Sequence, residues 1–434
     1  MKPSPSLPAP SSTSPALSLT LTLTLTLGMA STLPANSDDW PQWRGPHRDG
    51  HSQEKGLFQT WPAGGPKLAW KSNQAGSGYS TPSVVGDRIY LLGNDGLQDE
   101  SVRALGLKDG APIWSTRIGK VGNPDQKPPF PAARSTPTVE DGVVYALGSD
   151  GDLVALDAGK GGVRWRRSLR AEFGGKPGQW AYAESPLIDG DRLICTPGGA
   201  EATVLALNKT IGEVVWKAAL PEADEAGYSS AIRVDAGGAA QIVQLLQKGL
   251  VGLEATSGKL LWRHTRAVSR YGANIPTPVT FGDLVYFGAA GTGGGAVRLS
   301  ATAGGGVSAE EMYFEPKLPT AIGGAVKVGS ELYGTTAQAL LCVEFATGKV
   351  LWEERAIGAA SMCHADGRLY LHGENGEVAL VEPSPAGYRE KGRFTPPDAP
   401  KHSQPMEKSW AFPVVSQGRL LVRDHGTLWC YEVR

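Results

Sequence analysis

The sequence Ala155-Leu156-Asp157-Ala158-Gly159-Lys160-Gly161-Gly162-Val163-Arg164-Trp165 decides how this chain folds. It begins with a small residue, has a Gly six positions later and ends with a Trp ten positions later. The spacing recurs at Ala104 to Trp114, Ala155 to Trp165, Ala206 to Trp216, Gly252 to Trp262 and Cys342 to Trp352. Apolar runs flank each Gly, which reverses the chain readily, so every copy predicts the outer hairpin of a small antiparallel sheet.

Repetition at this spacing predicts an array of similar sheets. Trp114, Trp165 and Trp216 follow one another at intervals of 51 residues, which suits four strands and their turns. A small sheet with one apolar face cannot bury that face alone, so it needs neighbours. We therefore expect an all-β fold, an eight-bladed β-propeller with four-stranded antiparallel blades.

The inner hairpins place the blades along the chain, because they begin at Ser/Thr-Pro and turn at Gly-Asp or Asp-Gly pairs. We expect blades at residues 79–118, 134–169, 180–220, 227–266, 272–317, 321–357, 358–396 and 409–434, the last completed by 66–72. Blades five and seven lack the outer Trp, and we expect Phe314 and Phe394 in its place. Pairing of the N- and C-terminal strands should close the ring without a free edge.

Composition narrows the class of protein. The chain has 434 residues, 57 of them Gly, and a formal net charge of −1. The Gly content favours many turns over helices. A charge near zero without a basic run offers no electrostatic surface for nucleic acid, so we expect no nucleic-acid partner.

Residues 1–35 are predicted to be a signal peptide, residues 36–65 a leader, and residues 66–434 the propeller. Lys2 precedes a Pro/Ser-rich stretch, an apolar run over residues 16–27 and small residues suited to cleavage. That run is too short to span a bilayer comfortably, so we expect no membrane span; a disordered tail is the alternative. We expect a periplasmic or secreted monomer.

The four cysteines, Cys195, Cys342, Cys363 and Cys430, lie far apart, each within an apolar strand pattern. We expect them to be buried as small apolar residues. One long-range disulfide is the alternative that the sequence leaves open.

The stretch from Ala155 to Trp165 resembles the tryptophan-docking repeat of eight-bladed propellers of the pyrroloquinoline-quinone (PQQ) type. Two groups share that repeat: quinoprotein alcohol dehydrogenases, and the periplasmic scaffold subunit of the outer-membrane β-barrel assembly machinery. Residues 40–45 (Trp-Pro-Gln-Trp-Arg-Gly), together with 180–187 and 274–278, resemble a third group of exported PQQ-like repeat proteins whose function is not established. The resemblance covers nearly the whole mature chain and implies the fold, whereas a propeller alone implies no chemistry.

The resemblance to quinoprotein enzymes implies a vicinal disulfide, a Ca²⁺ held by Glu and Asn side chains, and an Asp base. This chain has no Cys-Cys pair, and Glu184 and Asn274 are the only matching acid and amide. We therefore predict no catalytic residue, no metal site and no firm cofactor. PQQ is the cofactor that the alternative function would require.

The candidate ligand-binding site is the mouth of the central channel, where the innermost strands begin. Counted back from the Pro that starts an inner strand, or from its equivalent Ala231, the third position holds aromatic residues and one Arg, and the second holds hydroxyls and one carboxylate. These residues are Tyr79, Arg134, Tyr228 and Trp410, and Ser80, Ser135, Glu184 and Ser229. Trp180 and Tyr182 alternate with Glu184 and should point to the same side of one strand; Asn274 completes the set.

Such groups suit a polar ligand or a peptide. The alternative is ordinary strand-start chemistry, in which the hydroxyls satisfy backbone groups, and Glu184 is then a structural partner of Arg134. We expect an exported, non-catalytic propeller that binds a partner protein or a small polar ligand at this mouth. The alternative function is a PQQ-dependent quinoprotein oxidoreductase acting on alcohols or sugars.

Overall fold

A computed structural model describes residues 1–9, 38–126, 131–221, 224–400 and 406–434. The chain divides into two units, Met1–Pro34 and Ala35–Arg434. Residues 1–9 contain no helix or strand, and residues 10–35 of the expected signal peptide lie outside the described residues. Within the described chain, no helix is long and apolar enough to cross a membrane.

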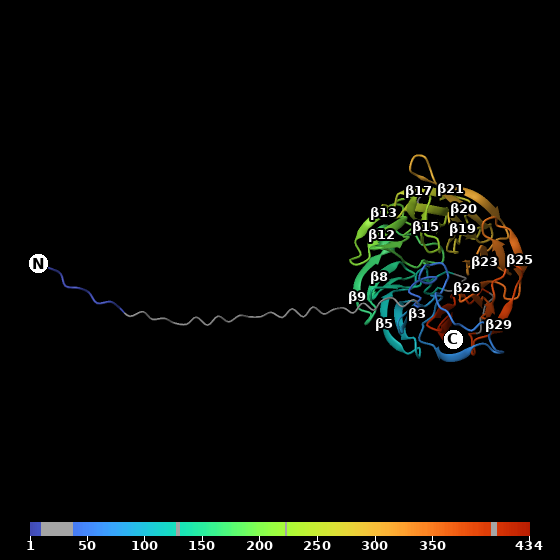
Figure 1. Ribbon diagram of the computed structural model, residues 1–434, viewed down its shortest axis with the longest axis horizontal. Helices are drawn as coiled ribbons and strands as arrows, with labels where there is room; N and C mark the ends of the chain where they lie inside the picture. The colour runs from blue at the N-terminus through green and yellow to red at the C-terminus, as the bar shows by residue number, and fades with distance from the viewer. Residues whose placement is uncertain (10–37, 127–130, 222–223, 401–405) are drawn as a thin grey trace. The chain divides into compact units, whose positions relative to one another are not determined.

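Eight four-stranded antiparallel sheets follow one another along the second unit, and Figure 1 shows them arranged as a ring. The expected eight-bladed β-propeller is therefore confirmed. The first four blades contain the following strands: β2 Ser83–Val85, β3 Arg88–Asp95, β4 Asp99–Gly106 and β5 Pro112–Gly119; β6 Thr138–Glu140, β7 Val143–Leu147, β8 Asp152–Asp157 and β9 Val163–Ser168; β10 Leu187–Asp189, β11 Arg192–Cys195, β12 Val204–Asn208 and β13 Val214–Ala218; β14 Ile232–Ala236, β15 Ala239–Leu246, β16 Gly249–Glu254 and β17 Leu260–His264. A short helix, α1 Leu169–Phe173, follows blade two.

The second half of the ring repeats this order. Blades five to eight contain the following strands: β18 Val279–Phe281, β19 Leu284–Ala289, β20 Gly293–Ala301 and β21 Val307–Glu315; β22 Ala325–Val328, β23 Glu331–Thr335, β24 Leu340–Glu344 and β25 Val350–Glu354; β26 Ala360–Ala365, β27 Arg368–Gly373, β28 Val378–Val381 and β29 Glu390–Phe394; β30 Val414–Ser416, β31 Arg419–Asp424, β32 Thr427–Glu432 and β1 Lys67–Ser72. Strand β1 is the fourth strand of blade eight, where Trp70 lies opposite Cys430. The predicted closure by both chain ends is therefore confirmed.

The core consists of apolar layers between adjacent blades. One such layer joins Leu147 and Leu153 of blade two to Leu193 and Leu205 of blade three, and all four side chains are fully buried. All four cysteines are buried and free, as expected from their apolar surroundings, and no disulfide forms among them.

The five outer hairpins share one geometry. Each has a β-bulge directly after the small residue that lies opposite the Trp, as between Ala155 and Leu156. Each turn glycine has a positive φ, between 67° and 74°. In blades one to four, a Cβ on that glycine would come within 2.8 Å of the indole of the preceding blade, so both the backbone and the packing require glycine.

Most of the indoles also hydrogen-bond across the blade junction. Their Nε1 groups donate to backbone oxygens of the next blade at 2.8–3.2 Å, as Trp70, Trp114, Trp165, Trp216 and Trp352 do. Trp262 instead donates to Gln241 Oε1 within its own blade.

In the two blades without the outer Trp, other aromatic rings pack at the junction with the next blade. In blade five, Tyr313 rather than the expected Phe314 packs against Gly348, the turn glycine of blade six. The Tyr313 hydroxyl donates to the Phe345 backbone oxygen at 2.7 Å. The prediction of Phe314 was wrong by one residue, because β20 and β21 are longer than the outer strands elsewhere and this changes the count to the ring. In blade seven the residue opposite the bulge position is Gly392, and the expected Phe394 lies two residues later, where its ring packs against Gly65.

The leader fills the base of the central channel, where turns such as that at residues 86–87 join the first and second strands. It is blue in Figure 1 and crosses the middle of the ring. Hydrogen bonds tie residues 38–54 to every blade, through Val84, Val139, Pro186, Ala231, Thr277, Ala325, His364 and Gly418. The leader is thus an internal part of the propeller.

Arg48 is the residue that connects the leader to blades three and four. Its guanidinium donates to the backbone oxygens of Ser185, Pro186 and Ala231 at 2.9–3.1 Å. Burial lowers the pKa of Arg48 to about 9. Because three backbone acceptors converge on this one buried cation, Arg48 holds the leader at a fixed position along the channel axis.

We predict that Trp216→Ala lowers the free energy of unfolding by about 3–5 kcal/mol, because it leaves a cavity at a blade junction and an unpaired carbonyl. Trp216→Phe should lose clearly less, since a ring stays in place. Urea unfolding of both variants, with the exposed Val214→Thr as control, measures this. Equal stability of Trp216→Ala and Val214→Thr would contradict the role of the indole.

We predict that Arg48→Met lowers the free energy of unfolding by about 3–5 kcal/mol, because three buried carbonyl oxygens lose their donor. The matched control is Arg164→Met on the exposed outer strand β9, where we expect a change of about 0.5 kcal/mol or less. Thermal and urea unfolding of both variants check the difference. Similar losses for the two would show that Arg48 does not anchor the leader.

Candidate functional site

The mouth of the channel carries a cluster of aromatic side chains around Tyr79. Its ring centroid lies 5.1 Å from those of Trp410 and His425, and the Arg134 guanidinium lies 5.5 Å from its centre. Burial raises the pKa of Tyr79 to about 12, and no described residue hydrogen-bonds its hydroxyl. Trp410 donates to Glu374 Oε1 at 3.1 Å. Blades one, two and eight thus meet at one polar and aromatic surface.

Tyr228 and Trp180 form the continuation of this cluster on blades three and four. Their rings make an edge contact at 5.7 Å, and the Tyr228 hydroxyl accepts the Trp180 backbone N–H at 3.1 Å. The charge of Arg134 acts on the pKa of both Tyr228 and Tyr79. The sequence-predicted residues at the third position before the inner-strand Pro therefore do lie together.

Arg134 is the cation of the mouth. It donates to the Ala132 oxygen at 2.8 Å and to Gln126 Oε1 at 3.3 Å. Burial lowers its pKa, and the carboxylate that acts on it is Glu100. Glu100 is fully buried, accepts from Ser149, and has a pKa raised to about 7 by burial. A poorly solvated guanidinium between aromatic rings is suited to recognise a polar partner group.

Ser80 turns into its own blade, whereas Glu184 connects blades three and four. In blade one, Ser80 Oγ accepts a hydrogen bond from the backbone N–H of Leu92 at 3.1 Å. In blade three, Glu184 Oε1 accepts one from the backbone N–H of Thr196. Glu184 Oε2 accepts from Gln244 at 3.1 Å. These two residues therefore do what strand-start residues ordinarily do, which is to satisfy backbone donors.

Glu184 has a different cation from the one that the sequence suggested. The positive charge acting on its carboxyl is that of Arg48 from the leader, not Arg134. Burial is the largest influence and raises the pKa of Glu184 to about 7. The carboxyl and the leader are thus electrostatically coupled below the mouth.

Tyr182 and Asn274 hold backbone in place. The Tyr182 hydroxyl donates to the Pro197 oxygen at 2.8 Å, and the ring is 1% exposed. Asn274 is fully buried; its amide donates to the oxygens of Leu246 and Ala267, and its Oδ1 accepts the N–H of Ser269. Ser135 is also buried, and no described residue hydrogen-bonds its Oγ.

The acid and amide that a Ca²⁺-bound quinone would need do not fit that role. The oxygens of Glu184 and Asn274 already accept hydrogen bonds from protein groups, and Asn274 binds the connections around blade four rather than lining the site of Glu184. A hard cation requires several free oxygen ligands at one place. Among the described residues, no three His, Cys, Asp or Glu side chains converge as metal ligands.

Sequence reasoning missed the contribution of the leader and of blade eight. Arg48, Gln244, Glu374 and His425 touch or support the predicted residues, yet none occupies the position counted from the inner-strand Pro. His425 has a positive φ of 48° in the β31–β32 turn, which orients it toward Tyr79. A rule that treats mouth-side turns as part of the site would have found His425 and Glu374.

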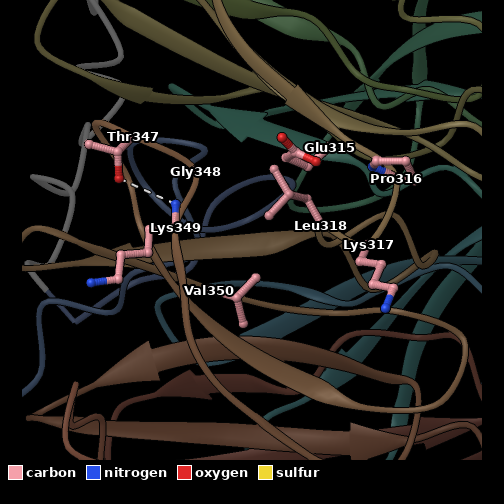
Figure 2. A pocket seen from close by; sticks show the side chains of 8 residues that line it. All are labelled: Glu315, Pro316, Lys317, Leu318, Thr347, Gly348, Lys349 and Val350. Atoms are coloured by element: carbon pink, nitrogen blue, oxygen red, sulfur yellow. Dashed lines mark hydrogen bonds between the residues drawn. The ribbon is translucent and has the colours of Figure 1, made fainter.

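A separate pocket of about 450 Å³ lies at the junction of blades five and six. Figure 2 shows the residues that line it, from the end of β21 and from the outer hairpin of blade six: Glu315, Pro316, Lys317, Leu318, Thr347, Gly348, Lys349 and Val350. None of the residues predicted for the mouth belongs to it.

Comparison with known proteins agrees with the fold. A family model described as outer membrane protein assembly factor BamB matches residues 98–354. The BamB protein of Salmonella typhimurium is 30% identical over 139 residues, which are 32% of this chain and 31% of that protein. Quinoprotein ethanol dehydrogenase of Pseudomonas aeruginosa is 34% identical over 106 residues, 24% of this chain and 16% of that one. Each alignment spans less than a third of the relative.

Solved structures show the same architecture. BamB from Moraxella catarrhalis superposes with a TM-score of 0.57 at 15% identity, covering 81% of this chain and 94% of that one. Quinohemoprotein alcohol dehydrogenase ADHIIG from Pseudomonas putida HK5 gives a TM-score of 0.53 at 13% identity, covering 92% and 80%. At such identities the likeness concerns the fold alone.

We predict that Glu184→Gln flattens the pH dependence of stability. Since the folded pKa of about 7 lies above the ordinary 4.5, the protonated carboxyl stabilises the fold at pH 4.5 and below, and this is lost as the pH rises to 7. The loss amounts to about 3 kcal/mol across that window. Urea unfolding at several pH values measures it, with Glu310→Gln as control. Identical pH profiles of the two variants would contradict the buried, raised-pKa carboxyl.

Proposed function

Because this chain belongs to the family described as outer membrane protein assembly factor BamB, we propose that it is a non-catalytic exported propeller that binds a partner protein at the mouth of its channel. The observation that carries this proposal is the contrast between the two ends of the channel. Hydrogen bonds to the chain's own leader occupy the base, while Tyr79, Trp410 and Arg134 gather at the mouth. The mouth is therefore the end of the channel at which we expect a partner to bind.

The connections on the mouth side support a protein as the partner. They link each outer strand to the next inner strand and are long, for example residues 265–278 and 395–413, whereas the base has short turns. Large apolar side chains are exposed on this side: Tyr271 is 66% exposed, Met406 52% and Leu97 40%. Exposed apolar and aromatic groups on loops are characteristic of binding surfaces.

The proposal extends to the export of the chain and to its chemistry. Residues 1–35 would direct export, and the protein would act as a monomer in the periplasm or outside the cell. The internal hydrogen bonds of Glu184 and Asn274 argue against a Ca²⁺-quinone site. A small polar ligand at Arg134 is the alternative occupant of the mouth.

We predict that a photo-crosslinking amino acid at Trp410 or Trp180 captures one defined protein in the cells that make this chain. The same amino acid at Asp141, in a base turn, should capture none. Arg134→Gln should reduce capture at Trp410 severalfold. Because the guanidinium is poorly solvated and lies near the buried Glu100, capture is compared at a temperature well below the melting temperature of both proteins. Equal capture from the mouth and base positions would contradict a mouth-specific partner.

The oxidoreductase alternative is tested directly. Purified protein is incubated with PQQ and Ca²⁺, and dye reduction is followed with alcohols and sugars. We expect no turnover above that of free PQQ. Saturable, protein-dependent turnover would overturn the non-catalytic proposal, whatever the crosslinking shows.

A further inference from the structure

Three of the eight blade junctions share a second contact besides the packed ring. Two residues after the outer aromatic residue, a side chain donates a hydrogen bond to the oxygen of the next blade's turn glycine. Three junctions show it: Ser72 to Gly110 at 2.9 Å, Thr116 to Gly161 at 2.7 Å and Arg167 to Gly212 at 2.7 Å. At these junctions the side-chain donor links the outer strand of one blade to the outer hairpin of the next.

Among the described residues, this contact is absent at the junction of blades six and seven, where the residue two positions after Trp352 is Glu354, and at the junction of blades five and six. Here the residue two positions after Tyr313 is Glu315, and a carboxylate cannot donate to the Gly348 oxygen. No described residue hydrogen-bonds that oxygen, and none forms an ion pair with Glu315. At the junction of blades three and four the equivalent residue, Ala218, also offers no donor, but it is apolar and buried.

The pocket of about 450 Å³ lies at this defective junction. Val350 supplies exposed apolar surface, Leu318 is fully buried, and Glu315 and Gly348 line the pocket with a carboxylate and a backbone carbonyl. Lys317 and Lys349 stand at its edge with their side chains extended to opposite sides in Figure 2, and neither pairs with an acid among the described residues. The pocket therefore suits a hydrogen-bond donor, and the two lysines place positive charge at its edge.

Arg167 shows which donor fits. At the junction of blades two and three its Nε donates to the Gly212 oxygen, while its Nη1 pairs with Glu172 at 2.8 Å. Blade six offers the same pair of acceptors, a turn carbonyl and a carboxylate, without the guanidinium. A long aliphatic stem ending in a guanidinium would use both acceptors and cover the exposed Val350.

We propose that this pocket binds an arginine side chain of a partner polypeptide, next to an acidic residue that meets Lys317 and Lys349. The guanidinium donates to the Gly348 oxygen, as Arg167 does to that of Gly212, and pairs with Glu315, which itself stands at the position equivalent to Arg167. The site is separate from the mouth, so a partner could contact the rim of the ring independently of the site proposed for function.

The test uses the whole protein and short blocked peptides. We expect acetyl-Gly-Arg-Asp-Gly-amide to bind with a dissociation constant of about 1 mM, since it makes only a few charge-assisted contacts. Replacing Arg by citrulline, or Asp by Asn, should weaken binding at least about tenfold and severalfold, respectively. Ligand-observed NMR measures these weak affinities.

Two variants at one position give opposite controls. Glu315→Gln should weaken the peptide at least about tenfold, because it removes the carboxylate, whereas Glu310→Gln on the same strand should not. Glu315→Thr should restore the junction bond that Thr116 makes, raise the melting temperature and abolish peptide binding. Its raised melting temperature would exclude misfolding as the cause.

Three results would overturn the proposal. They are equal binding of the arginine and citrulline peptides, equal binding by Glu315→Gln and Glu310→Gln, and agmatine binding as tightly as the peptide. The last would assign the pocket to a free guanidinium compound instead of a polypeptide. Because none of these residues lies at the mouth, failure here leaves the crosslinking result at Trp410 unaffected.

Discussion

The propeller depends on one contact, an aromatic ring of one blade packed against the turn glycine of the next. Glycine is needed twice at this point, once for its positive φ and once because a Cβ would strike the ring, as at Gly258 against Trp216. The contact also explains why the hairpin and the Trp recur together in the sequence. Neither a lone blade nor an open array could bury these faces, so the ring must close.

The leader changes what a propeller of this size can do. A ring of eight blades encloses an axial channel, and here residues 38–54 hydrogen-bond to all eight blades around it. Arg48 and Glu184, both buried, join this segment to the middle blades. The polar groups at the base of the channel thereby hold the leader in place, whereas the predicted aromatic residues and Arg134 gather at the mouth.

Much of the architecture could be predicted from the sequence, because strand length, turn residues and the Trp spacing repeat locally. The position of Tyr313 could not, since the long hairpin of blade five changes the count between the small residue and the ring. At the mouth, counting from the inner-strand Pro placed Tyr79, Arg134, Tyr228 and Trp410 together. It misjudged Glu184, whose partners come from the leader and from blade four, far away in the chain.

Closure by β1 and β32 has a consequence for biogenesis. Strand β1 pairs with β32, so the ring cannot close until both of these distant strands are present. Until then β1 is an unpaired edge, and the leader has no complete set of inner strands to bind. A chain whose longest-range contact joins its two ends should also fold slowly. Blade eight should therefore be the last blade to complete, since each of the other seven forms from one continuous segment.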